Sequence, residues 1–167
     1  KWDVVDQNIR RVMGEGIDIN TSSTVGLMNV YHIPEFVDRM LGYGLKPQNI
    51  EMNNILTFPD YYHMNILPKH IKSMIAKKLD NHIVELRKKH SNKVAEIFEY
   101  NYSVFKKYLY SAPQRDVHEI RREFKSMVLK KDKHRKTDFG TALPHLKEWF
   151  DSLETISPDN KEKSYLL

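Results

Sequence analysis

The sequence contains no cysteine among its 167 residues, and this absence excludes more chemistry than any other feature of its composition. Without a thiol, the chain has no disulfide, no thiolate zinc site, no cysteine nucleophile and no cysteine-bound iron–sulfur cluster of its own. The lack of cysteine also fits a protein of the cytoplasm, where thiols stay reduced. We therefore expect a cytoplasmic location.

Other signatures are missing as well. No apolar run approaches the roughly 18–20 residues that a membrane-spanning helix needs, so we expect no membrane partner. The first residues, Lys1-Trp2-Asp3, lack the apolar stretch of a secretory signal. Glycine-rich phosphate loops and the nucleophile elbow of hydrolases are absent, and the eight histidines have no metal-binding spacing. We predict neither a catalytic residue nor a metal ligand within this chain.

What the sequence does contain is a strongly uneven charge. Residues 1–67 have a net charge of −3, residues 68–136 carry 19 basic and 8 acidic residues for a net charge of +11, and residues 137–167 return to −3. A zone of this charge is typical of nucleic-acid binding, and lysines are interleaved with aromatic residues over 98–110. Long helices with solvated charged faces explain the same charge, and the aromatic spacing is that of a buried helix face. We favour this second explanation.

The apolar pattern of the first half predicts a parallel strand–helix–strand unit. Residues 3–13 have helical spacing, and the β-branched run 17–25 predicts a strand with a polar end. A short helix opens at Pro34, and residues 49–56 form a second predicted strand that ends before Pro59. A strand, a crossover helix and a second strand imply a parallel pair.

The second half is predicted to be helical. Apolar stripes recur over 68–86, 91–109 and 113–128, and a last helix is expected near 144–153. Residues 130–136 are so highly charged that they are expected to form a connector. The fold class is therefore α/β, with a small parallel sheet followed by a helical half.

Both predicted strands end in polar side chains. Asn20 to Thr24 close the first strand, and Asn53 and Asn54 close the second. In α/β sheets, ligands bind beyond the carboxyl ends of the strands, which favours a site here. Serine and asparagine also begin loops by satisfying local backbone groups, and this explanation stays open.

Several short motifs follow one another in a defined order over residues 2–150. They are Trp2-Asp3-x-Val5…Asn8-Ile9, Ile17-x-Ile19…Ser23-Thr24-Val25…Asn29-Val30…Ile33-Pro34-Glu35, Ile50…Asn53-x-Ile55-Leu56-x-x-Pro59, Ile66-Leu67-Pro68…Ile71-Lys72, Asp132-x-x-Arg135 and Leu143-Pro144-x-Leu146. In their order and spacing, these motifs resemble the later part of a radical S-adenosylmethionine enzyme barrel of the twitch-domain type.

This resemblance implies a partial (β/α) barrel fragment with two or three of the barrel strands. Residues 1–67 would form its parallel βαβ part, residues 68–156 a helical region packed on it, and residues 157–167 a flexible tail. The intact parent enzyme would use S-adenosylmethionine and a [4Fe–4S] cluster. The cluster-binding C-x3-C-x2-C loop of the family is not in this sequence. The chain is thus expected to hold no cofactor and to be inactive by itself.

The resemblance also suggests site residues and a partner. Ser23 and Asn53 would be polar contacts of the cofactor or substrate, and Leu56 an apolar neighbour of the adenine. Two strands leave open sheet edges, so we expect a homo-oligomer rather than a nucleic-acid complex. The alternative function is a non-enzymatic helical interaction module that binds nucleic acid or an acidic partner through residues 68–136.

Overall fold

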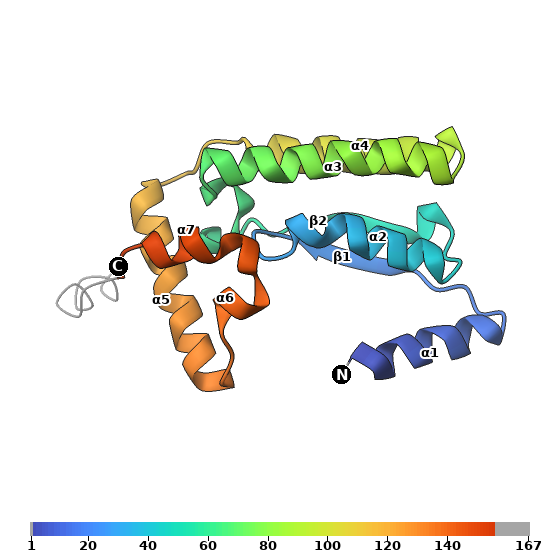
Figure 1. Ribbon diagram of the computed structural model, residues 1–167, viewed down its shortest axis with the longest axis horizontal. Helices are drawn as coiled ribbons and strands as arrows, with labels where there is room; N and C mark the ends of the chain where they lie inside the picture. Colours follow the sequence, from blue (N-terminus) through green and yellow to red (C-terminus); the bar gives the residue numbers. More distant parts are fainter. Residues whose placement is uncertain (1, 156–167) are drawn as a thin grey trace.

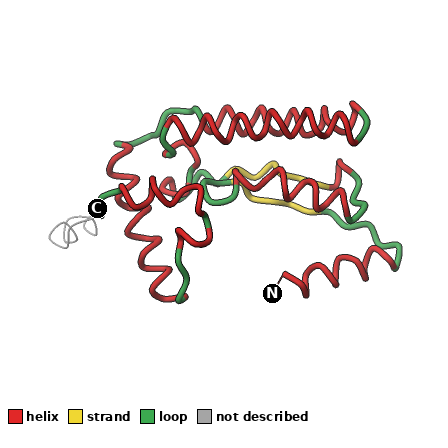
Figure 2. The backbone as a smooth tube through the Cα atoms, in the orientation of Figure 1, coloured by secondary structure: helices red, strands yellow, loops and turns green. Residues whose placement is uncertain are grey.

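Two parallel strands and the helix that joins them form the centre of the fold, as the sequence predicts. The structure, a computed structural model, describes residues 2–155. Helix α1 (Trp2–Gly14) precedes strand β1 (Thr21–Val25), helix α2 (Ile33–Gly42) and strand β2 (Ile50–Ile55) (Figures 1 and 2). The predicted strand at 17–25 is shorter in the structure because residues 17–20 lie outside the strand pairing.

The sheet has one covered face and one uncovered face. Thr21 pairs with Ile50 and Val25 with Ile55, and the register shifts between Ser22 and Thr24. Neither strand pairs with a further strand within residues 2–155, so both outer edges of the sheet are open there. Alternate side chains enter the core on the covered face, whereas the uncovered face is polar. The exposed polar residues of the two strands are Ser22, Thr24, Glu51, Asn53 and Asn54.

Five helices follow the sheet within residues 2–155. Helices α3 (Lys69–Lys89) and α4 (Asn92–Leu109) lie side by side along the sheet, and α2 lies in front of it in Figure 1. Helix α5 (Val117–Arg135) runs across one end, where α6 (Phe139–Ala142) and α7 (Lys147–Ser152) pack near it. Short 3₁₀ turns connect these elements at Val30–His32, Pro47–Asn49, Asp60–Tyr62, Met64–Ile66 and Pro144–Leu146.

One buried core joins the sheet to the helices. Aromatic side chains of α4 lie at its centre, and Phe98, Tyr102 and Phe105 are each at most 1% exposed. Phe124 of α5 stacks against Trp149 of α7 with 5.6 Å between ring centroids. The aromatic run of α4 is therefore largely core, as its helical spacing predicts.

The expected connector at residues 130–136 is wrong, because α5 continues to Arg135. A last helical turn that faces solvent needs no apolar side chains, and cations there interact favourably with the helix dipole. Lys136 then adopts a left-handed conformation with φ of 54°, which ends the helix. The Asp132 carboxylate fixes this turn by accepting hydrogen bonds from Thr137 Oγ1 and Phe139 N, both at 2.7 Å.

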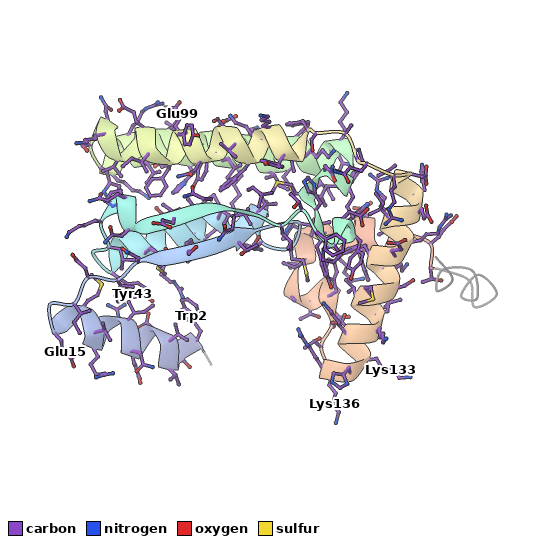
Figure 3. All side chains as sticks on the ribbon, turned by 180° about the vertical axis from the view of Figure 1, so that it is seen from behind. Trp2, Glu15, Tyr43, Glu99, Lys133 and Lys136 are labelled. Atoms are coloured by element: carbon purple, nitrogen blue, oxygen red, sulfur yellow. The ribbon has the colours of Figure 1, made fainter. Side chains whose placement is uncertain are left out.

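Helix α1 is held loosely against the rest of the molecule and has no buried residue. The Tyr43 hydroxyl donates a hydrogen bond to Asp6, and the Arg39 guanidinium lies 5.1 Å from the centre of the Trp2 ring. Figure 3 shows Tyr43 and Trp2 in the space between α1 and the sheet unit. The predicted flexible tail at 157–167 lies outside the described residues. Within residues 2–155, no helix is both long and apolar enough to cross a membrane.

Candidate functional site

A pocket of about 500 Å³ lies at the carboxyl ends of both strands. We call it the strand-end pocket. Thr24 and Gly26 come from the end of β1, Leu56 directly follows β2, and the opposite wall comes from the end of α5 and from α6. Its lining residues are Thr24, Gly26, Met28, Asn29, Leu56, Tyr62, Val128, Lys131, Asp132, Arg135, Thr137, Asp138, Phe139 and Ala142.

The turn after β1 is built by one asparagine side chain. Asn29 Oδ1 accepts a hydrogen bond from the Gly26 N–H at 2.8 Å, and Asn29 Nδ2 donates one to the Thr24 carbonyl, also at 2.8 Å. Gly26 permits a close approach of the chain, because a Cβ there would lie 3.1 Å from the Leu56 side chain and 3.2 Å from the Tyr62 carbonyl. Glycine at this position therefore brings the ends of the two strands and the following loop together.

On the α5 side of the pocket, two charged side chains have partners within residues 2–155 and a third has no ion pair there. Lys131 Nζ donates a hydrogen bond to the Tyr62 hydroxyl at 2.5 Å, and the Asp132 carboxylate is used in the turn after α5. Arg135 is exposed and pairs with no carboxylate among residues 2–155. Its guanidinium is therefore available to an anionic group of a ligand at the mouth of the pocket.

The structure brings one of the three predicted contact residues into this pocket. Leu56 lines the pocket, whereas Ser23 and Asn53 do not. Ser23 is half-buried at the register shift of β1, and Asn53 is exposed on the uncovered face of the sheet. Their neighbours meet instead, since Asn54 Nδ2 donates to Ser22 Oγ at 3.2 Å.

Sequence reasoning did not single out Gly26, Tyr62 or Lys131 as site residues. A glycine directly after a strand is a signal of close backbone approach, and Gly26 was identifiable on this basis. Tyr62 and Lys131 carry no such signal, because they meet through tertiary packing between residues 69 positions apart.

The basic zone at 68–136 is spread over the three helices α3, α4 and α5. Many of its cations pair with acidic residues: Lys78 Nζ lies 2.5 Å from Glu35, Arg87 lies 2.6 Å from Glu99, and Lys106 lies 2.6 Å from Asp80. These pairs are partly exposed, as expected for the solvated faces of long helices.

A buried histidine connects three helices. His82 of α3 is 7% exposed, and its Nδ1 lies 2.7 Å from the Tyr102 hydroxyl of α4. Its Nε2 lies 3.1 Å from the Asp38 carboxylate of α2. Burial raises the pKa of Tyr102, so its hydroxyl remains a donor. In the tautomer whose Nε2–H donates to Asp38, Nδ1 accepts the hydrogen bond from the Tyr102 hydroxyl.

No group of three or more histidine or acidic side chains within residues 2–155 has the arrangement needed to hold a metal ion. Comparison of the chain with protein-family models, with curated proteins and with solved structures gave no significant match.

Proposed function

We propose that the chain is the C-terminal part of a radical S-adenosylmethionine enzyme, and that the strand-end pocket contributes to its cofactor and substrate site. One observation carries this proposal. Three separate motifs of the family resemblance supply walls of the same pocket: Thr24 at the end of β1, Leu56 after β2, and Asp132 with Arg135 at the end of α5. The resemblance depends on the order of these motifs in the sequence, and residues from three of them line one pocket.

The residues of the pocket suit the adenosyl and amino-acid parts of S-adenosylmethionine. Leu56, Val128 and Phe139 offer an apolar wall to an adenine ring, and Arg135 offers a cation to a carboxylate. The volume of about 500 Å³ lies within the range of roughly 300–1,000 Å³ that small-molecule sites occupy. Leu56 would then hold the adenine by apolar contact, and Arg135 would orient the carboxylate of the cofactor or substrate.

The chain does not fit the [4Fe–4S] cluster of such an enzyme. The cluster needs thiolate ligands, and the sequence has no cysteine. The ligands would come from a part of the parent enzyme outside this sequence, and the chain by itself would be inactive. When bound, S-adenosylmethionine supplies the radical chemistry, whereas the residues described above bind, orient and shield.

The two faces of the sheet support the partial (β/α) barrel in this proposal. In such barrels, helices cover the outer face and the other face looks into the barrel. Here the covered face is apolar, and the uncovered face carries Ser22, Thr24, Glu51 and Asn53. Asn53 would face the barrel interior, and Ser23 would stand beside the register shift. The open edge of β1 would pair with the preceding barrel strand.

A homo-oligomer and a cytoplasmic location belong to the same proposal. Without preceding barrel strands, the open edge of β1 is available to a second copy of the chain. Light scattering across a concentration series tests this assembly. A mass of 19.8 kDa at every concentration contradicts it.

A ligand titration tests the cofactor site. Methyl-labelled protein is titrated with S-adenosylmethionine, and we expect saturable shifts at Leu56 and Val128. The variant Leu56→Ser should weaken these shifts, whereas Leu129→Ser, at an exposed position on α5, should not. Shifts that are absent, or that do not respond to Leu56→Ser, contradict the proposed site.

The coding sequence that precedes Lys1 tests the parentage separately. A C-x3-C-x2-C motif in the same reading frame supports the proposal, and a native start codon directly before Lys1 contradicts it. Salt-tolerant, sequence-selective binding of an oligonucleotide would favour the alternative of an interaction module. Lys133 and Lys136, at the free end of α5 in Figure 3, are the first residues to replace in that case.

A further inference from the structure

A second cavity, of about 300 Å³, lies between the loop after β2, the end of α4 and the linker to α5. We call it the loop cavity. It shares no lining residue with the strand-end pocket. The lining residues are Thr57, Asp60, His63, Asn65, Lys107, Tyr108, Ser111, Ala112, Pro113, Gln114 and Ile120.

The loop cavity contains a buried histidine with an unused hydrogen-bond donor. His63 is 7% exposed, and its Nδ1 accepts the Asn65 N–H at 3.0 Å. Burial lowers the pKa of His63, so the ring is neutral and carries its proton on Nε2. That Nε2–H has no hydrogen-bond partner among residues 2–155.

The Nε2–H of His63 is accessible from the loop cavity. The fully enclosed side-chain atoms without a partner in the described part of the chain belong to His145 and Trp149, not to His63. Because His63 lines the cavity, its Nε2–H faces a space that a ligand can enter. An accessible N–H on an otherwise buried ring can donate to an acceptor group of a ligand that enters the cavity.

The two charged side chains that line the loop cavity differ, because the Asp60 carboxylate is paired within residues 2–155 and the Lys107 ammonium is not. Arg115 binds both oxygens of the Asp60 carboxylate, at 2.9 and 3.0 Å. The Asn65 amide donates to the Ser111 hydroxyl and to the Ala112 carbonyl. Lys107 is exposed and has no ion pair within residues 2–155. The His63 N–H and the Lys107 ammonium both complement a negative charge.

The apolar and charged residues around the loop cavity favour a singly charged organic anion over a phosphate. Tyr108 has its ring 5.9 Å from that of His63, and Pro113 and Ile120 add apolar surface. A phosphate dianion favours arginine forks, but the nearby Arg115 is already held by Asp60 and Glu123. The Asp60 carboxylate at the wall also opposes a double negative charge.

We propose that the loop cavity binds a small organic carboxylate. The carboxylate accepts the His63 Nε2–H and lies near Lys107, and the apolar part of the molecule packs against Tyr108 and Ile120. This inference stands on the loop cavity and does not depend on the function proposed for the strand-end pocket.

The test is a titration of the whole chain, followed through the ¹⁵N signals of the His63 ring. Benzoate, butyrate, inorganic phosphate and butanol are the probes. We expect saturable shifts of Nε2 with benzoate or butyrate, and weaker or no shifts with phosphate and butanol. Binding of phosphate in preference to both carboxylates overturns the proposed class, and the absence of saturable binding by any probe overturns the site.

Two substitutions at His63 distinguish the role of its Nε2–H in binding from the role of its Nδ1 in the turn at Asn65. His63→Asn keeps an acceptor near the Nδ1 position for Asn65 N–H but removes the Nε2 donor, whereas His63→Gln keeps a donor near Nε2. We expect His63→Asn to weaken benzoate binding about tenfold or more, because it removes one hydrogen bond to a charged group. His63→Gln should bind more tightly than His63→Asn. Equal affinities of these two variants and the unmodified chain overturn the proposed contact.

A second pair of variants avoids any change to the buried loop. Lys107→Met removes the cation at the loop cavity, and Lys93→Met removes an exposed cation near the other end of α4. We expect Lys107→Met to weaken benzoate binding several-fold and Lys93→Met to leave it unchanged. The same effect from both variants would mean that general charge attraction, and not this cavity, holds the probe.

Discussion

Removing the Tyr102 hydroxyl should destabilise the chain through the histidine that it leaves behind. Tyr102→Phe keeps the ring, which is 1% exposed, and deletes the group 2.7 Å from His82 Nδ1. The acceptor on His82 is then buried without a partner, because the ring is 7% exposed. Such a loss costs about 1–3 kcal/mol of unfolding free energy. In a chain of this size, each kcal/mol lowers the Tm by roughly 2–4 °C.

In a variant that lacks His82, removal of the Tyr102 hydroxyl should no longer destabilise the chain. In a His82→Leu variant, Tyr102 is the group that lacks a partner, so adding Tyr102→Phe should be neutral or stabilising. The coupling between the two substitutions should lie at about 0.5–3 kcal/mol, as for residues in direct contact. Urea unfolding of the four proteins of this cycle measures it.

Tyr100→Phe is the matched control, because Tyr100 lies on the same helix and is 71% exposed. Its effect should stay within about 0.5 kcal/mol. If Tyr102→Phe is as harmless as Tyr100→Phe, or if the Tyr102→Phe effect is the same with and without His82, the hydrogen bond is not what stabilises this contact.

Three further predictions concern the strand ends and the C-terminal helices. Gly26→Ala should cost about 1–3 kcal/mol in urea unfolding, because its Cβ would press on the adjoining loop, whereas Gly14→Ala, with no atom within 4 Å, should be neutral or slightly stabilising. Asp132→Ala should cost about 1–3 kcal/mol and speed hydrogen exchange at the Phe139 amide, and unchanged exchange there would contradict the bond. Burial, with charge repulsion from His32, lowers the pKa of His145 to about 4, below the 6.5 of an unfolded chain. This contribution to stability is complete above about pH 6.5 and is lost as the pH falls toward 4, so thermal unfolding of His145→Phe should show a shallower slope over that window.

Much of the fold follows from patterns that the sequence displays directly. The apolar stripes of α3 and α4 predict long helices, and the structure buries those stripes while it leaves the lysines outside. The parallel pairing of β1 and β2 follows from the helix between them, because a crossover of that kind returns the chain in the same direction. Local periodicity was sufficient for these elements.

What the sequence did not predict depends on single side chains and on contacts between distant residues. Residues 130–136 have the composition of a connector, yet helix α5 runs through most of them, and Asp132 secures its end by bonds to residues further along the chain. The partners of His82 are likewise 20 and 44 residues away, so its spacing predicts burial but not the network. In β1, Ser23 lies at a register shift, and no pattern in the sequence predicts that shift.

The loop after β2 belongs to both cavities. Tyr62 lines the strand-end pocket, and the next residue, His63, lines the loop cavity. The backbone between them is held on one side by the Leu27 N–H, which donates to the Tyr62 carbonyl at 3.0 Å, and on the other by the turn at Asn65. Two consecutive residues on a braced segment move together, so a molecule that shifts this loop to enter one cavity alters a wall of the other. If both proposed ligands bind with such a shift, occupancy of the two sites is thermodynamically linked, and each ligand then changes the affinity for the other by the same factor.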